Sequence, residues 1–390
     1  MPRKQGRRDP HDRGVIDMRV LITNFYMGNR SGTVQYVRDL ALELTRRGHA
    51  AAVYTWQRGP VCTELEASGI QVIETPRRCR FSPDIVHAHH YPITLAALRS
   101  FATIPGIFVC HDHLPSWAWD RSPNHPRIRR YYGVSALCVD RLRMEGAPAD
   151  RTLLLPNFVD LTRFRPRPPL PAHPRRALVF SNYAHARTHL PVIAEACRLV
   201  GLDLDVIGEG AGRASIRPEE TLGRYDIVFA KAKAAIEAMA VGAAVVLCDS
   251  DGAGPMVTSD GLDELRSLNF GFEALREPLR PTSLLPQIAR YDAEDAARVR
   301  DRIRATAGLD RAIERLIGIY EEVIGEYSGR PATTPPTEPC LSPPSLARHY
   351  LSAKAFAHWQ EVSPDRRNTF LTFLGMGAIR SWGRGLLRGR

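Results

Sequence analysis

Residues Phe229–Asp249 read FAKAKAAIEAMAVGAAVVLCD, a run of alanines and small aliphatic residues with one carboxylate, Glu237, near its middle. The part around Glu237 predicts a helix, and the AAVVLCD that follows predicts a buried strand. A carboxylate in apolar surroundings costs several kcal/mol unless it has a partner. Glu237 therefore indicates a polar ligand or, as the alternative, a helix face that is open to solvent.

This run belongs to a longer alternation of short apolar strands with amphipathic helices. Just before it, RALVFSNY, LDLDVIG and YDIVFAK predict strands, with a helix around 187–200 between the first two. Near the start of the chain, MRVLITNF predicts a strand and SGTVQYVRDLALELTRRGH a helix. Strands are also expected at AAVYT, GIQVIETP, DIVHAHH, GIFVCHD and VSALCVD, the last of which spans 134–140.

The alternation predicts an α/β protein whose parallel sheets are covered by helices on both faces. A proline-rich interruption places a hinge near 157–175, so we expect two Rossmann-like domains facing a central cleft. Ligands of such sheets bind beyond the carboxyl ends of the strands, and loops of both domains should point into the cleft. The predicted divisions are a disordered leader (1–17), an N-terminal domain (18–172), a C-terminal domain (173–327), a Pro-rich linker (328–345) and a basic amphipathic tail (346–390).

The formal net charge of +11 lies mostly near the two ends of the chain. Residues 1–17 hold five basic and three acidic side chains, and residues 346–390 hold eight basic and two acidic ones. The remainder is nearly balanced and has no basic stripe with interleaved aromatic residues, which argues against nucleic-acid binding. The tail mixes arginines with Phe, Leu, Ile and Trp, which suits an anionic membrane surface, although a solvated tail fits it equally well.

The seven cysteines are scattered without a C-x-x-C pair, as is typical of reduced thiols in a cytoplasmic protein. No apolar run approaches the roughly 20 residues of a membrane-spanning helix. The leader lacks the apolar core of a signal peptide. We therefore expect a cytoplasmic protein, peripheral at the inner membrane face if the tail binds lipid.

NFVDLTRFRPR resembles the hinge motif N-G-V-D-x-x-x-F-x-P of family 4 glycosyltransferases, and EAMAVGAAVV resembles their E-A-M-A-x-G-x-P-V-V. PDIVHAHH and VCHD occur in the family's order, and the resemblance spans about residues 18–326. It implies the GT-B fold, with the nucleotide-sugar in the C-terminal domain, the acceptor in the N-terminal domain and no obligatory metal. For Glu237 it implies a carboxylate that accepts hydrogen bonds from the ribose of the donor, near the positive end of a helix.

The sequence departs from that family at the donor motif. The family carries a second acid eight residues before the glutamate, where this chain has Phe229, and its G-F-G-L becomes Ala230–Lys233. The family's G-R and K-G are also missing from SNYAHARTHL, where Arg187 is the nearby cation and a candidate ligand of the donor. We expect Lys231 and Lys233 to neutralise the donor diphosphate instead. The alternative is that both are solvated lysines at the start of a helix.

Two features of the N-terminal half also indicate a site. GNRSGTVQYV places Gly28 and Gly32 at a turn between a strand and a helix, where backbone N–H groups can approach an anion. Any tight turn of this kind also favours glycine. His111 ends a strand, and the resemblance implies that it contacts the transferred sugar or the departing phosphate. A lone histidine is more often structural, and the nearby alternatives are His87, His89, His90 and His113.

The acids of Asp249–Asp251, DSD, follow a strand and are able in principle to bind a divalent cation. A D-G turn comes directly after the strand, however, and turn chemistry accounts for these residues better, so no metal is predicted. The next residues, GAGPMVT, place Gly252 and Gly254 at the expected start of another helix, close to the donor phosphates.

These features and the resemblance to family 4 together predict a glycosyltransferase of hexosyltransferase type that moves a sugar from a nucleotide-sugar to a glycan, lipid-linked or small-molecule acceptor. By analogy with the family it retains the anomeric configuration and needs no metal or other cofactor. The candidate catalytic residues are His111 and Glu237. Two alternatives stay open: a degenerate GT-B protein that binds a nucleotide-sugar or a partner without turnover, and a sugar-nucleotide epimerase.

Overall fold

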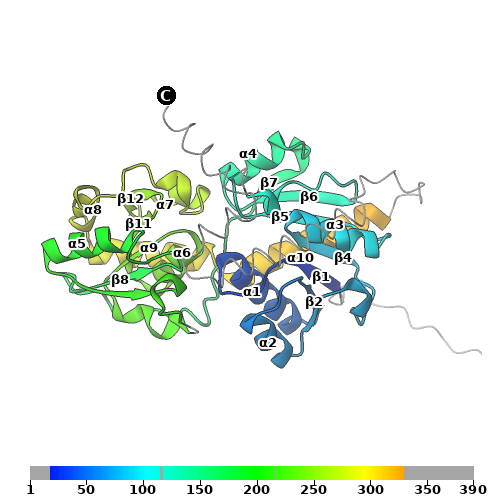
Figure 1. Cartoon of the computed structure of the whole chain (residues 1–390), viewed down its shortest axis with the longest axis horizontal. Coiled ribbons are helices and arrows are strands. Elements are labelled where there is room, and N and C mark those ends of the chain that lie inside the picture. Colours follow the sequence, from blue (N-terminus) through cyan, green and yellow to red (C-terminus); the bar gives the residue numbers. More distant parts are fainter. Residues whose placement is uncertain (1–17, 115–116, 216, 329–390) are drawn as a thin grey trace, which may run out of the picture.

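The computed structural model describes residues 18–114, 117–215 and 217–328, which form two lobes side by side (Figure 1). The N-terminal lobe is built on a seven-stranded parallel sheet in the order β3-β2-β1-β4-β5-β6-β7. Its strands are β1 (Arg19–Thr23), β2 (Ala50–Tyr54), β3 (Gln71–Ile73), β4 (Ile85–His89), β5 (Gly106–Cys110), β6 (Ile128–Gly133) and β7 (Thr152–Leu154).

The helices of this lobe cover the sheet because each presents an apolar face to it. They are α1 (Gly32–Arg46), α2 (Pro60–Ala67), α3 (Tyr91–Ser100) and α4 (Ala136–Met144). In α1, Val34, Val37, Ala41 and Leu44 recur at steps of three and four residues and are all buried. The helix ends before Gly48, whose positive φ of 89° suits glycine.

The C-terminal lobe has a five-stranded sheet in the order β12-β11-β10-β8-β9. The strands are β8 (Arg176–Phe180), β9 (Asp203–Ile207), β10 (Ile227–Ala230), β11 (Ala244–Asp249) and β12 (Gly252–Met256), and all pairs are parallel except β11 with β12. The helices of this lobe are α5 (Leu190–Val200), α6 (Ala232–Val241), α7 (Leu262–Ser267), α8 (Pro281–Ile288) and α9 (Ala293–Thr306), and the last described helix of the chain is α10 (Leu309–Ser328). The predicted α/β class with parallel sheets in two Rossmann-like domains is confirmed.

Short 3₁₀ helices occur in the connections of both lobes. They are η1 (Pro76–Arg78), η2 (Ala118–Asp120), η3 (Ala149–Arg151), η4 (Glu209–Ala211), η5 (Pro218–Glu220), η6 (Leu222–Arg224) and η7 (Phe272–Ala274).

The chain crosses between the lobes twice, at neighbouring points. The first crossing runs from Phe158, which packs in the N-terminal core, to Val159, which packs in the C-terminal core. The second lies just before α10. The two crossings are hydrogen-bonded to each other, because the Val159 N–H donates to the Ala307 carbonyl and the Leu309 N–H donates to the Val159 carbonyl, both at 2.9 Å. The hinge therefore consists of two adjacent segments.

Helix α10 returns to the N-terminal lobe and packs on its core. Ile313, Leu316, Tyr320 and Val323 are fully buried there, and the Tyr320 hydroxyl lies 2.5 Å from His87 Nδ1. The prediction that residues 173–327 form the C-terminal domain is therefore wrong for this last helix. Its apolar stripe faces the first sheet, which no local pattern could indicate.

One strand of the N-terminal sheet was predicted in the wrong place. The expected strand at 134–140 lies mostly in α4, because Ser135 caps the helix by accepting a hydrogen bond from the Cys138 N–H at 3.3 Å. The strand is β6, just before it, whose Tyr131 and Tyr132 are buried.

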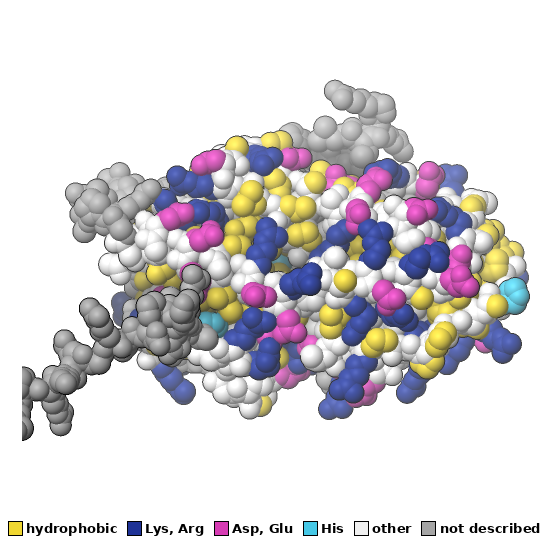
Figure 2. Space-filling model, turned by 180° about the vertical axis from the view of Figure 1, so that it is seen from behind, with side chains coloured by type: hydrophobic (Ala, Val, Ile, Leu, Met, Phe, Trp, Pro, Cys, Tyr) yellow, Lys and Arg dark blue, Asp and Glu magenta, His cyan; other side chains and the backbone are white. Residues whose placement is uncertain are grey.

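The predicted leader, linker and tail, with the tail's membrane role, lie outside the described residues, apart from Ser328 at the end of α10. The six cysteines of the described part carry free thiols. None of the described helices is long and apolar enough to cross a membrane. Figure 2 shows acidic and basic side chains interspersed over the face that it draws, so that face carries no single-sign patch.

Candidate active site between the domains

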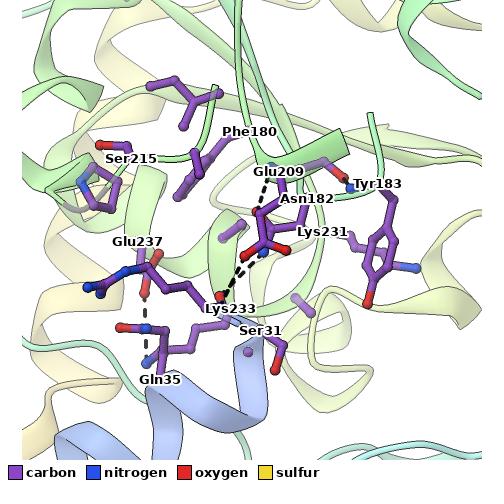
Figure 3. Close-up of a pocket in the computed structure, with 18 of the residues that line it drawn as sticks. Ser31, Gln35, Phe180, Asn182, Tyr183, Glu209, Ser215, Lys231, Lys233 and Glu237 are labelled. Atoms are coloured by element: carbon purple, nitrogen blue, oxygen red, sulfur yellow. Dashed lines mark hydrogen bonds and ion pairs between the residues drawn. The ribbon is translucent and has the colours of Figure 1, made fainter. Parts of the chain in front are cut away.

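A cavity of about 200 Å³ lies between the two lobes, beyond the carboxyl ends of β1, β8, β9 and β10. Its N-terminal wall is the start of α1 with the preceding loop, and Figure 3 shows Ser31 and Gln35 of this wall opposite the labelled residues of the C-terminal lobe. Both lobes therefore supply loops to one shared cavity, as expected for this class of sheet. The C-terminal wall includes Phe180, Ser181, Asn182, Tyr183, Ile207, Glu209, Lys231, Ala232, Lys233, Ala234 and Glu237.

The N-termini of two helices meet at this cavity. Gly32 begins α1 and Ala232 begins α6, and a Cβ built on Gly32 would lie 4.0 Å from the Cβ of Lys233. The first turns of both helices have backbone N–H groups without helical acceptors, and the helix dipoles place positive potential at the same ends. Together they form an environment that favours an anion such as a phosphate.

Lys231 is the residue just before α6 and lines the cavity. Its ammonium is paired with Asp249 and lies 3.5 Å from Asp251 Oδ2. Burial lowers the pKa of the Lys231 amino group, but the two carboxylates outweigh burial and the pKa is raised overall. Lys231 is therefore charged, yet it must change partners before its ammonium can neutralise a phosphate.

Lys233 is buried and also bonded to a carboxylate. Its Nζ lies 3.0 Å from Asp39 Oδ2 on α1 and 3.1 Å from the Phe158 carbonyl oxygen. A second carboxylate, Glu237, lies 3.8 Å away on the next turn of α6. Lys233 would have to leave its ion pair with Asp39 of the other lobe before it could neutralise a diphosphate as predicted.

Glu237 lines the cavity from within the apolar part of α6. Burial raises the pKa of its carboxyl to about 7, against the opposing effect of the Lys233 cation. Glu237 thus changes its charge near neutral pH, and it is placed to accept hydrogen bonds from a ligand in the cavity. Its predicted contact with the ribose of a donor stays a prediction.

Hydrogen bonds between the lobes also join residues that line the cavity. The Asn182 side-chain amide donates to the Arg30 carbonyl at 3.3 Å, and the Arg30 N–H donates to Glu209 Oε1 at 3.3 Å. Gln35 adds a buried amide nitrogen that has no hydrogen-bond partner among the described residues. Sequence reasoning missed Asn182, Glu209 and Gln35, because only the tertiary fold brings these residues to the cavity.

The comparisons with known proteins agree with this architecture. Residues 30–163 match the family model described as Glycosyltransferase Family 4. Among solved structures, HepE of Anabaena in complex with UDP and glucose is 14% identical, with a TM-score of 0.59, covering 78% of this chain and 99% of that one. A glycosyltransferase from Rickettsia africae ESF-5 is 15% identical, with a TM-score of 0.55, covering 79% and 99%. The chain has the GT-B fold.

The predicted resemblance to family 4 glycosyltransferases is thereby confirmed, by the family model over the N-terminal domain and by the GT-B fold of both domains. The same HepE protein, in complex with UDP-glucose, is 13% identical with a TM-score of 0.59. No curated protein matches the sequence.

Within the GT-B fold, His111 follows β5 in the N-terminal domain but does not line the cavity described above. Its Nε2 lies 2.8 Å from His89 Nδ1, and its N–H donates to Asp120 at 2.9 Å. Burial, with the Lys233 cation, lowers the pKa of His111 to about 3. His111 is therefore neutral at physiological pH, and its catalytic role stays a prediction. His87, His89 and His90 are buried around it.

Gly252 and Gly254 do not start a helix, and that prediction is wrong. They lie on β12, the antiparallel edge of the sheet, and do not line the cavity. Close packing explains the glycines, since a Cβ on Gly254 would lie 2.5 Å from the Ala274 carbonyl oxygen. Arg187 is exposed between β8 and α5 and is also absent from the cavity wall.

The connection between β10 and α6 is a single residue long. Phe229 lies within β10 and is fully buried, and Lys231 alone separates the strand from the helix. The position eight residues before Glu237 is therefore in the sheet and not in a loop that faces the cavity. The acids of Asp249–Asp251 contact Lys231, and the described residues contain no group of three or more side chains suited to a metal ion.

Proposed function

We propose that the protein is a glycosyltransferase that moves a sugar from a nucleotide-sugar to an acceptor bound in the cleft. The observation that supports this most is the cavity in which two helix N-termini, one from each domain, meet a buried carboxylate. The helix ends suit the diphosphate of a donor, and Glu237 suits two neighbouring ribose hydroxyls.

The chemistry we propose is mainly electrostatic. As the bond between the sugar and the diphosphate breaks, negative charge grows on the leaving phosphate, and the first turns of α1 and α6 stabilise it. The cleft holds the acceptor hydroxyl near the sugar, which replaces a bimolecular encounter by a positioned one. We propose retention of configuration and transfer of a hexose by analogy with the family. Asp249 and Asp251 would not serve as metal ligands, because Lys231 pairs with them.

The test is release of nucleoside diphosphate from a panel of nucleotide-sugars, with and without candidate acceptors. UDP-glucose is a suitable first probe, because the structural neighbour HepE has been solved with it. Acceptor-dependent release of UDP would support the proposal, and its absence with every donor, together with absence of binding, would reject it.

A second candidate is a GT-B protein that binds the nucleotide-sugar without turnover. It is favoured by the pairing of Lys231 and Lys233 with carboxylates, which leaves neither ammonium free for a leaving phosphate in this structure. Calorimetric binding of UDP-glucose without UDP release from any donor and acceptor would favour this candidate over the transferase.

A further inference from the structure

The ion pair between Asp39 and Lys233 joins the two domains inside the molecule. Asp39 lies on α1 of the N-terminal domain, and Lys233 lies in the first turn of α6 of the C-terminal domain. Their charged atoms are 3.0 Å apart, and the side chains are only 2% and 5% exposed. Because both charges are buried, removal of either partner would leave an unpaired buried charge and destabilise the protein.

Lys233 has a second carboxylate within reach. Glu237 lies four residues further along α6, which places it on the same face of the helix, and its Oε1 is 3.8 Å from Lys233 Nζ. In this structure Asp39 is the nearer partner, at hydrogen-bond distance, so the lysine is drawn toward α1. Glu237 is left with a more distant cation and faces the cavity.

The two carboxylates belong to different domains. Asp39 lies on α1 of the N-terminal domain, whereas Lys233 and Glu237 share helix α6 of the C-terminal domain. Separation of the domains at the hinge would take Asp39 away from Lys233 and leave Glu237, one helical turn along α6, as the neighbouring carboxylate. A lysine that loses one carboxylate in this way pairs with the other, as oppositely charged side chains four residues apart on a helix do.

We propose that Asp39 is a positioning residue that draws Lys233 away from Glu237 when the domains close. In the open state Lys233 pairs with Glu237 and occupies the carboxylate, and in the closed state Glu237 is released to accept the ribose hydroxyls of the donor. The carboxylate is thereby available only when both domains enclose the cavity. This inference rests on the proposed function, since it assigns regulation of the same donor site.

Other charges around the pair are compatible with the exchange. Asp39 also contacts Arg38 on α1 at 3.0 Å, so it keeps a cationic partner when Lys233 leaves, and it contacts Arg163 of the C-terminal domain at 3.5 Å. Arg163 is in turn bonded to Glu219 at 2.9 Å, in the C-terminal domain. Besides Lys233, the charged groups that face Glu237 are Asp39, Arg163 and Glu219.

The experiment measures the affinity for UDP-glucose by calorimetry at pH 9, well above the pKa of about 7 for Glu237. Asp39→Asn should leave Lys233 on Glu237 and weaken binding by about tenfold, the size of one lost charge-assisted hydrogen bond. Adding Lys233→Gln to Asp39→Asn should restore much of the affinity, because the lysine that occupies Glu237 is gone. Failure of the double variant to bind more tightly than Asp39→Asn would overturn the inference.

Glu43→Gln is the matched control, because Glu43 lies one turn further along α1, is also a nearly buried carboxylate, and pairs with Arg46 and Arg47 away from this cavity. It should bind UDP-glucose like the wild type. If Asp39→Asn does not fold, Lys233→Gln alone supplies the test. If the ion pair is purely structural, Lys233→Gln should weaken UDP-glucose binding by about tenfold. If the exchange occurs, Lys233→Gln should bind UDP-glucose within about threefold of the wild type.

The outcomes separate this inference from the proposed function. Wild-type protein that binds no nucleotide-sugar contradicts the donor site itself. Wild-type protein that binds UDP-glucose, with Asp39→Asn unaffected, leaves the proposed function standing and removes the role of Asp39. Distance measurements between fluorophores on the two domains give a further readout: Asp39→Asn should favour the open state without ligand, and Glu43→Gln should not.

Discussion

At the scale of single residues, Glu237 combines burial in an alanine-rich helix with a position on the cavity wall. Burial raises the pKa of this carboxyl to about 7, above its value in the unfolded chain. The neutral form is therefore favoured by folding, and the stability that Glu237 contributes is complete below its unfolded pKa and is lost as the pH rises through 7. The same rise creates the charged acceptor that a ribose would use.

Replacement of Glu237 by Gln should keep the fold and weaken UDP-glucose binding at pH 8 by about 1–3 kcal/mol, because a charged acceptor becomes a neutral one. In the wild type, affinity should rise between pH 6 and pH 8 as Glu237 ionises, and in Glu237→Gln that rise should disappear. Calorimetry across this range tests both statements. A donor analogue without ribose hydroxyls is the control, and an equal loss of affinity for that analogue would contradict the assigned contact.

Phe229, unlike Glu237, does not line the cavity, because it is fully buried inside β10. Phe229→Glu would restore an acid at the family's spacing but place it in the sheet, where an unpaired charge costs at least about 3 kcal/mol. We expect a lower urea midpoint and no gain of activity. A stable variant with faster turnover would show that this position reaches the cavity after all.

The sequence predicted those cavity residues that belong to a recognisable motif or stand at the start of a helix. Glu237, Lys231, Lys233 and Gly32 stand in a motif or at a helix start, and all four line the cavity. Gln35 lines it too, but a glutamine inside an amphipathic helix has no signal of its own. The glycines of β12 had the right composition for a helix start, and only the packing of the neighbouring backbone explains them.

At the scale of elements, the strand–helix alternation sufficed to predict the sheets, and it failed where polar residues interrupt a strand. In β6, Arg129 and Arg130 stand in the middle of the strand, and their contacts with Glu326 of α10 compensate the buried charge. That compensation comes from a helix almost 200 residues away in the chain, as the pairing of Arg130 with Glu326 shows. Local pattern therefore favoured the more apolar residues that follow.

The start of α6 carries a prediction of its own. Lys231→Ala should weaken binding of UDP more than binding of uridine, because Asp249 and Asp251 would then face the phosphates without their cation. We expect a difference of about 1.5–3 kcal/mol between the two ligands. Lys231→Arg, which keeps the charge, is the control. Equal and small effects on UDP and uridine would place Lys231 outside the phosphate site.

At the scale of the whole molecule, α10 makes the N-terminal core depend on the far end of the described chain. Ending the chain at Gly308 should expose the surface that Ile313, Leu316, Tyr320 and Val323 cover, and should also leave His87 without its tyrosine partner. We expect the N-terminal domain to lose its cooperative unfolding transition. Limited proteolysis and circular dichroism measure this loss. A chain that ends at Ser328 is the control and should keep both domains folded.

The position of α10 also determines the order in which the two domains can finish folding during synthesis on the ribosome. The sheet of the first domain emerges early, but the helix that closes its core is synthesised only after the entire second domain, about 150 residues and roughly eight to thirty seconds later. During that interval the apolar surface under α10 stays open to solvent or to a chaperone. The domain that begins first is thus the one that finishes last, and slowing synthesis within the second domain would prolong its exposure.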